Sequence, residues 1–480
     1  MIIELGIKTL KEAIFTLVIL SPITALRCLS MLRRILFDLR YLRHFLRQYF
    51  RYKKEYYLIR RSQYFPLEQN LKIQRERLFK LVKHAIENVP YYRRIAQERK
   101  ITITEQTIFN DLKKFPVLTK EIIRTHWKEL HVSLKAERYI INTSGGTTGE
   151  PIRIIQDRRY LVESESGNLV FDEFADAHGG DRIVKLWGNE KEIFNETRGL
   201  SHYIERFFSN TYYQNAFRMG AKKIKQYVEE LHSLAPKTIV AYIQSLYEMA
   251  RYIDTYGLKV PHVHSIIVSA GSLTDEVRSF IERLFKCKVF NRYGSREVGL
   301  IASSCNKENM LHINMLQKYV EIVDDQFNTV REHERGNILV TNLLCYAMPL
   351  IRYAIGDRGS LNRASCSCGR GLIRLENVYG RVVDVFKNKE GELIDGEYFT
   401  HLFYFRENVK RFLVVQDQID EINIYIVTEN SQKLDSTIEK EIIEKVKLVM
   451  GHDCHISLKY MNDIPLPRSG KIRYTISKVS

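Results

Sequence analysis

The sequence predicts an α/β fold: a large domain whose sheets are rich in parallel strands, followed by a small α+β domain. Three observations predict it. The chain has 480 residues, too many for one compact core. Apolar strand candidates alternate with helical segments between residues 182 and 285, a pattern typical of parallel sheets. The last hundred residues contain two strands, a helix and a further strand.

Composition limits the function classes. The formal net charge is +17, and residues 27–61 hold eleven Lys or Arg against two acids, Asp38 and Glu55. Such a segment suits an anionic surface such as lipid headgroups; a solvated basic helix is the alternative. The positive charge is the one feature that favours a nucleic-acid partner, and charge alone is not enough to predict one. Seven cysteines, an odd number, in so long a chain predict a reducing, cytoplasmic setting.

The N-terminal segment, residues 1–60, is predicted to be separate from the catalytic fold. Its apolar run, residues 14–26, is short for a transmembrane helix, and acids precede the run, unlike a signal peptide. The basic, aromatic-rich stretch after it can lie along the inner face of the membrane or pack on the main domain as a helix.

The large domain is predicted over residues 61–381. Residues 71–99 read as helical, and Thr119 is a candidate N-cap for a helix over 120–130. Strands are expected at 182–187 and 238–242 and a strand with its turn at 265–272, with a helix at 275–285. Shorter strands follow at 319–323, 336–341 and 350–353. The C-terminal domain, 382–480, is expected to contain strands at 412–416, 422–427 and 455–460 and a helix at 434–449.

Ligands of parallel α/β sheets bind where the strands end. Trp187, Tyr242, Ala270 and Gly271 stand at such ends. We therefore expect Trp187 and Tyr242 to line a substrate pocket, and Ala270 and Gly271 to lie beside a nucleotide.

A Gly/Thr-rich loop at residues 142–151 follows the strand candidate 139–141 and precedes another at 152–155. Its glycines free the backbone to approach a ligand, and its hydroxyls can bond anionic oxygens. No Gly-Lys-Ser/Thr follows, so this is not the common nucleotide-binding loop. We expect a hairpin that closes over a polyphosphate; an ordinary glycine-rich turn is the alternative. The candidate phosphate-binding residues are Ser144, Gly145, Gly146, Thr147, Thr148 and Gly149.

Together with four later motifs, this loop resembles the AMP-forming (acyl-adenylate-forming) ligases, most closely the phenylacetate–coenzyme A ligase family. The motifs occur in the family's order at residues 291–297, 351–357, 379–381 and 465–473. The resemblance implies that Tyr293 and Gly294 lie against adenine and that Glu297 helps to hold Mg²⁺. It further implies that Asp357 accepts the ribose hydroxyls, that Arg381 lies near ribose or phosphate, and that Lys471 reaches the reacting carboxylate.

The resemblance implies that ATP and a small carboxylic acid form an acyl-adenylate, which is then transferred to coenzyme A. Two positions depart from the family: Arg296 replaces a hydroxyl residue, and Val383 stands where the family has an acidic pivot. The segment after Asp384 is more similar to the surface-polysaccharide biosynthesis branch, where the acceptor would be an amine or hydroxyl on a sugar precursor. A further alternative is a membrane-associated binding protein with a degenerate ligase fold.

A structural zinc site is also expected. The Cys-Ser-Cys-Gly-Arg stretch at 366–370 resembles one found in phenylacetate–coenzyme A ligase relatives, some of which carry zinc. Cys305, His312, Cys366 and Cys368 would close a tetrahedral site with no open position. The alternative is a pair of reduced cysteines on a turn.

Overall fold

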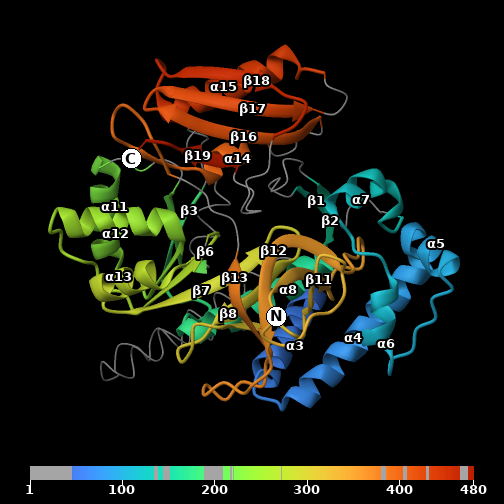
Figure 1. Cartoon of the computed structure of the whole chain (residues 1–480). Helices are drawn as coiled ribbons and strands as arrows, with labels where there is room; N and C mark the ends of the chain where they lie inside the picture. The colour runs from blue at the N-terminus through green and yellow to red at the C-terminus, as the bar shows by residue number, and fades with distance from the viewer. Residues whose placement is uncertain are drawn as a thin grey trace, which may run out of the picture.

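The computed structural model describes residues 46–133, 139–143, 152–188, 209–216, 219, 221–271, 273–379, 385–403, 408–428, 432–464 and 474–479. Within this part of the chain, an eleven-stranded sheet forms the centre of a large domain, and a four-stranded sheet forms a C-terminal domain (Figure 1). The predicted α/β fold with a small C-terminal α+β domain is confirmed.

The described chain begins with helices, of which α3 and α4 lie at the end of the large domain away from the C-terminal domain (Figure 1). The predicted helix over 71–99 is two helices, because Pro90 holds Val89 in an extended conformation that ends the first one. Thr119 is the predicted N-cap and accepts a hydrogen bond from the Ile122 amide, but the helix after it is shorter than expected. The helices are α3 (Leu46–Ser62), α4 (Leu67–Asn88), α5 (Pro90–Glu98), α6 (Ile108–Asp111) and α7 (Lys120–Thr125).

The first half of the large sheet is parallel, in the order β4-β3-β5-β6-β7. Its central strands are apolar and almost wholly buried, as expected for strands with both faces covered. The predicted strand–helix units are present. The bounds are β3 (Ile183–Trp187), β4 (Thr211–Asn215), β5 (Thr238–Tyr242), β6 (Ser265–Ser269), β7 (Lys288–Ser295), α11 (Ala221–Leu234), α12 (Ile243–Thr255) and α13 (Asp275–Phe285).

The second half of the sheet is antiparallel. The sequence predicts sheets rich in parallel strands and does not predict this half. Its order is β10-β11-β12-β13-β9-β8, and β8 pairs with β7. The predicted strand over 350–353 is displaced, since β12 begins at Tyr353. The bounds are β8 (Gly299–Ser304), β9 (Leu311–Ile313), β10 (Lys318–Val323), β11 (Gly336–Asn342), β12 (Tyr353–Asn362) and β13 (Arg374–Tyr379).

The C-terminal domain has the strand order β18-β17-β16-β19 with helix α15 packed against β18. The predicted elements are all present. Their bounds are β16 (Val409–Gln418), β17 (Glu421–Thr428), α15 (Ser436–Met450), β18 (His455–Tyr460) and β19 (Thr475–Ser477), preceded by β14 (Val385–Lys387), β15 (Leu393–Asp395) and α14 (Glu397–His401). Among the described helices, none is both long and apolar enough to cross a bilayer.

Candidate active site

The strands that flank the Gly/Thr-rich loop form the expected hairpin. β1 (Tyr139–Thr143) pairs antiparallel with β2 (Arg153–Asp157), and Thr143 lies opposite Arg153. The loop residues Ser144, Gly145, Gly146, Thr147, Thr148 and Gly149 lie outside the described residues. Their phosphate-binding role stays a prediction.

The hairpin is joined to the 291–297 motif through a buried glutamine. The Gln156 side chain accepts a hydrogen bond from Asn142 at 3.4 Å and donates one to the carbonyl oxygen of Arg296 at 3.0 Å. Both strands of the hairpin therefore take part in one contact with the turn that carries Glu297. Arg296, at which the sequence departs from the family, is exposed.

Two tyrosines connect the 291–297 motif with the 351–357 motif. The Tyr293 hydroxyl donates to Asp357 Oδ2 at 2.7 Å, and the Tyr353 hydroxyl donates to Glu297 Oε1 at 3.2 Å. Each motif thus holds a carboxylate of the other, although they lie about 60 residues apart in the sequence. The sequence placed Tyr353 inside a motif but did not predict its contact with Glu297.

Arg352 fixes the start of β12 and thereby the position of Tyr353. Its guanidinium is buried, lies 3.2 Å from Glu321 and donates to the carbonyl oxygen of Phe115 at 2.9 Å. Its backbone is left-handed, with φ 52°, a conformation that a non-glycine residue adopts at a cost. Burial raises the pKa of Glu321, while the charge of Arg352 opposes that rise. This buried pair anchors the second motif in the core.

The carboxyl ends of the parallel strands carry the other predicted residues. The rings of Trp187 and Tyr242 lie 4.2 Å apart between centroids, at the ends of the neighbouring strands β3 and β5. Ala270 and Gly271 follow β6 and are exposed, and Ala270 is left-handed, with φ 57°. A Cβ on Gly271 would lie 2.4 Å from the Ile243 side chain. The structure thus brings these four residues to one edge of the sheet.

Gly294 is required by close backbone packing. A Cβ at this position would lie 2.6 Å from the carbonyl oxygen of Gly299 on the paired strand. We expect Gly294→Ala to destabilise the large domain by about 1–3 kcal/mol, the usual cost of overpacking, and to weaken the ATP binding that the resemblance implies by displacing Tyr293. Urea unfolding and nucleotide titration measure the two effects.

Gly257→Ala is the matched control, since a Cβ there meets no atom within 4 Å although φ is 57°. It is expected to cost about 1 kcal/mol through its backbone and to leave ATP binding unchanged. Equal ATP affinity in the two variants would contradict the role of the β7–β8 turn.

The predicted zinc residues form a compact cluster. The candidate ligand atoms of Cys305, His312, Cys366 and Cys368 all lie within 4.8 Å of one another. Cys305 Sγ is 3.8 Å from Cys366 Sγ, and Cys368 Sγ is 3.5 Å from His312 Nε2. Zinc–sulfur bonds of about 2.3 Å in a tetrahedron place two sulfurs about 3.8 Å apart. The donor set and its spacing therefore fit a tetrahedral zinc ion.

The neutral form of His312 agrees with metal binding, whereas the Cys366 thiol would have to lose its proton. Burial, with the nearby charges of Arg370 and Arg374, lowers the pKa of His312 to about 3, so its imidazole is neutral, as a ligand must be. Burial raises the pKa of Cys366 to about 12 in the absence of a cation. A divalent ion would offset this cost, because the thiolate is the form that binds metal.

Two further predicted residues, Arg381 and Lys471, lie outside the described residues, as do Val383 and Asp384 of the hinge. Their predicted roles are neither supported nor opposed by the described geometry.

Comparison with solved structures shows a shared fold. A 2-hydroxyisobutyryl-CoA ligase, crystallised in an open conformation with 2-HIB-AMP and CoA, superposes with a TM-score of 0.56 at 17% identity. That alignment covers 87% of this chain and 93% of the other.

Relatives in sequence define the resemblance more closely. Protein CapK of Staphylococcus aureus is 26% identical over 89% of this chain and 94% of its own length. The phenylacetate-coenzyme A ligase of Thermus thermophilus is 27% identical over 67% of this chain and 72% of its own. The family model for the CapK C-terminal domain matches residues 386–478. These findings confirm the resemblance to the AMP-forming ligases, in particular to the phenylacetate–coenzyme A ligases and CapK.

Proposed function

We propose that this protein is an ATP-dependent, AMP-forming carboxylate ligase that makes an acyl-adenylate and transfers the acyl group to the thiol of coenzyme A. The observation that carries the proposal is the reciprocal contact of the two motifs, Tyr293 with Asp357 and Tyr353 with Glu297. The turn that carries Glu297 also contacts the hairpin that bears the Gly/Thr-rich loop, through Gln156 and the carbonyl oxygen of Arg296. The similarity to phenylacetate–coenzyme A ligases supports the same reaction class.

In the first half-reaction, a carboxylate oxygen of the substrate attacks the α-phosphorus of ATP. The bond from that phosphorus to the bridging oxygen breaks, and pyrophosphate leaves with the electron pair. Asp357 is proposed to accept the ribose hydroxyls, with Tyr293 holding its orientation. The loop residues and Lys471 are proposed to neutralise the phosphates and the reacting carboxylate. Arg381 is proposed to lie near ribose or phosphate.

Glu297 is the proposed protein ligand of Mg²⁺. Its buried carboxylate accepts a hydrogen bond from the Tyr353 hydroxyl, and a carboxylate is the kind of hard oxygen ligand that Mg²⁺ takes in proteins. A bound Mg²⁺ would supply charge stabilisation at the phosphates. Trp187 and Tyr242 are proposed to line the pocket for a small carboxylic acid.

In the second half-reaction, the thiol sulfur attacks the acyl carbon, AMP leaves with the electron pair of the broken carbon–oxygen bond, and the thiol proton passes to solvent. A second candidate acceptor is an amine or hydroxyl on a sugar precursor. Two observations support this second acceptor: the similarity to CapK over 89% of the chain, and the match of the C-terminal domain to the CapK family model. A degenerate binding protein is less favoured, because Glu297 and Asp357 are retained and held in place.

ATP–pyrophosphate exchange across a panel of aryl, acyl and amino acids tests the proposal. We expect one class of acid to support exchange, and Lys471→Ala to lower it about 10²-fold, the cost of losing one charge that stabilises the transition state. Lys440→Ala, at an exposed lysine of α15, is the matched control and should leave exchange unchanged.

The outcomes separate the candidates. Exchange followed by thioester formation with coenzyme A supports the acid–thiol ligase. Exchange with transfer only to an amino sugar or hydroxyl acceptor supports the second candidate. ATP binding without exchange for any acid would favour the binding protein instead.

A further inference from the structure

Helix α3 and the turn after it carry three exposed aromatic residues on one side. Phe50, Tyr57 and Tyr64 are 64%, 51% and 56% exposed and are spaced seven residues apart, which places them along one face of a helix. Tyr64 lies in the turn that continues α3, where its amide donates to the carbonyl oxygen of Arg61. We call these three residues, with Lys54 and Arg61, the outer stripe of α3.

The outer stripe is basic as well as aromatic. Lys54 and Arg61 are exposed, are also seven residues apart, and each follows an aromatic member by four positions. Neither enters an ion pair with another described residue. The acid of this helix, Glu55, is buried and points the other way. The stripe therefore presents rings and cations together, the chemistry that suits an anionic, partly apolar surface.

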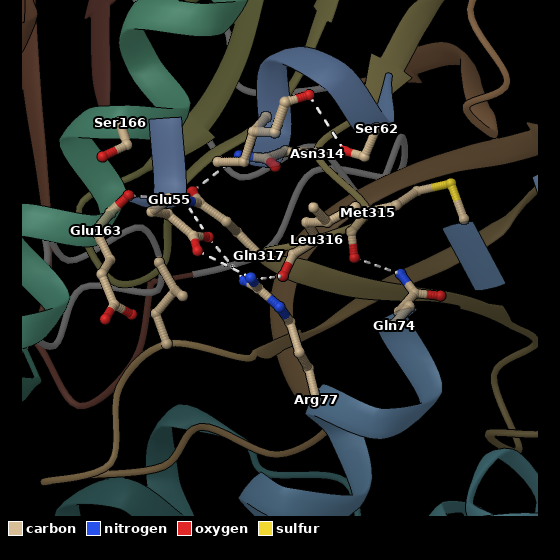
Figure 2. Close-up of polar contacts among 12 residues, drawn as sticks. Glu55, Ser62, Gln74, Arg77, Glu163, Ser166, Asn314, Met315, Leu316 and Gln317 are labelled. Atoms are coloured by element: carbon tan, nitrogen blue, oxygen red, sulfur yellow. Dashed lines mark hydrogen bonds and ion pairs between the residues drawn. The ribbon is translucent and has the colours of Figure 1, made fainter. Parts of the chain in front are cut away.

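The inner face of α3 is fixed to the large domain by a buried polar network (Figure 2). Glu55 receives both terminal nitrogens of Arg77, at 2.7 and 2.8 Å, and the amide of Gln317 at 3.3 Å. Arg77 also donates to the carbonyl oxygen of Leu316, and Gln317 to that of Glu163 on helix α8 (Arg158–Asp172). Because Glu55 and Arg77 bind each other and several further partners, helix α3 cannot easily rotate about its own axis. The outer stripe therefore faces outward.

The C-terminal end of α3 is held as well. The carbonyl oxygen of Gln63 accepts the Gly371 amide at 2.9 Å, and the Arg370 guanidinium donates to the Gln63 side chain at 2.6 Å and lies 5.4 Å from the Tyr64 ring. The loop that bears two of the candidate zinc ligands thus adjoins the stripe. Anything that binds the stripe is connected to the catalytic domain through fixed contacts.

We propose that the outer stripe of α3 docks on the surface of a bilayer that contains anionic lipids. Tyrosine and phenylalanine rings settle at the headgroup level, and Lys54 and Arg61 pair with anionic headgroups. The sequence just before α3 adds the same chemistry, with arginines at 27, 33, 34, 40 and 43 after the apolar run 14–26. Since α3 is fixed to the large domain, docking sets the orientation of the catalytic domain on the membrane.

A tryptophan placed in the stripe reports on docking in the full-length chain. Tyr57→Trp is compared with Tyr256→Trp, at a tyrosine 64% exposed after the end of α12. The vesicles contain brominated phosphatidylcholine and about 30% phosphatidylglycerol. We expect the brominated vesicles to reduce the tryptophan fluorescence of Y57W by roughly twofold more than that of the unsubstituted protein. Bromine quenches tryptophan fluorescence at the boundary between headgroups and acyl chains, where the ring at position 57 is proposed to lie. Y256W should show no added quenching.

Charge removal gives an independent readout. The double variant Lys54→Gln/Arg61→Gln should bind these vesicles about 30-fold more weakly in flotation, from the usual contribution of two basic residues at an anionic surface. Lys222→Gln/Lys225→Gln, at two exposed lysines of α11, is the control and should bind as the unsubstituted protein does. A higher salt concentration should reduce the difference in vesicle affinity between the two double variants, because salt screens the attraction to anionic lipids.

Three results would overturn the proposal. Flotation without quenching of Y57W would assign membrane binding to the residues before α3. Absence of flotation would exclude a lipid surface. A doubled mass in light scattering that Tyr57→Ser/Tyr64→Ser returns to the monomer would show that a second copy of the chain covers the stripe.

Discussion

Replacing Glu297 by glutamine is expected to lower ATP–pyrophosphate exchange about 10³-fold while the protein stays folded. Glutamine keeps an oxygen that can accept the Tyr353 hydroxyl, which lies 3.2 Å from Glu297. The change therefore removes the negative charge from a side chain only 3% exposed and keeps its size. Losing the proposed Mg²⁺ ligand removes several kcal/mol of charge stabilisation at the phosphates, and about 4 kcal/mol corresponds to that fold-change.

The measurement is exchange at a series of Mg²⁺ concentrations, with thermal unfolding to verify the fold. Half-saturation should require much more Mg²⁺ in E297Q than in the unsubstituted enzyme. Tyr353→Phe is the matched control: it keeps the carboxylate and removes one hydroxyl, so a loss of about 10-fold and a normal Mg²⁺ requirement are expected. If E297Q retained both rate and Mg²⁺ dependence, the contact between Tyr353 and Glu297 would be structural only.

The sequence was sufficient to predict the motifs that carry Glu297 and Asp357, but not the contacts between them. β7 and β12 are separated in the sheet by β8, β9 and β13, so no local pattern relates Tyr353 to Glu297. Such contacts depend on the register of every strand between them. The roles of Lys471, Arg381 and the Gly/Thr-rich loop come from the resemblance and stay predictions.

Two differences in the fold have local physical causes. The apolar residues Leu350 and Ile351 suggested a strand, but the guanidinium of Arg352 turns inward to Glu321, and its left-handed backbone delays the strand to Tyr353. The break between α4 and α5 follows from Pro90, a signal that the sequence did contain. The antiparallel half of the sheet could not be distinguished from a parallel one, because short buried strands have the same apolar pattern in both.

The inward orientation of Glu55 was also hidden in the sequence. It appeared as one acid in a basic segment, whereas its partner Arg77 lies on α4 and its second partner, Gln317, lies far along the chain. The described helix α3 packs on the main domain through one face, and the exposed residues of its other face carry the docking proposal.

Replacing Cys366 by serine is expected to abolish zinc binding and to lower the free energy of unfolding on the order of 5 kcal/mol. Serine keeps the size of the side chain but cannot supply a thiolate, and three ligands no longer close the tetrahedral site. The loss of stability should appear first in the loop after Cys368, where the carbonyl oxygen of Gly371 accepts a hydrogen bond from the side-chain amide of Asn70 at 2.9 Å. A Cβ on Gly371 would lie 1.9 Å from the carbonyl oxygen of Phe65, so the loop fits closely against the chain after α3.

Metal analysis of the purified protein, denaturant unfolding and amide hydrogen exchange over residues 63–70 measure this effect. Cys454→Ser in the C-terminal domain is the matched control, since Cys454 and Cys366 are both 5% exposed. It should retain one zinc per chain and lose only about 1–2 kcal/mol, the cost of burying a hydroxyl. Because the loop after Cys368 contacts the chain at the end of α3, C366S should also speed hydrogen exchange at residues 63–70, whereas C454S should not. Equal stability losses in the two variants, with no zinc in the unsubstituted protein, would instead make these residues reduced cysteines on a turn.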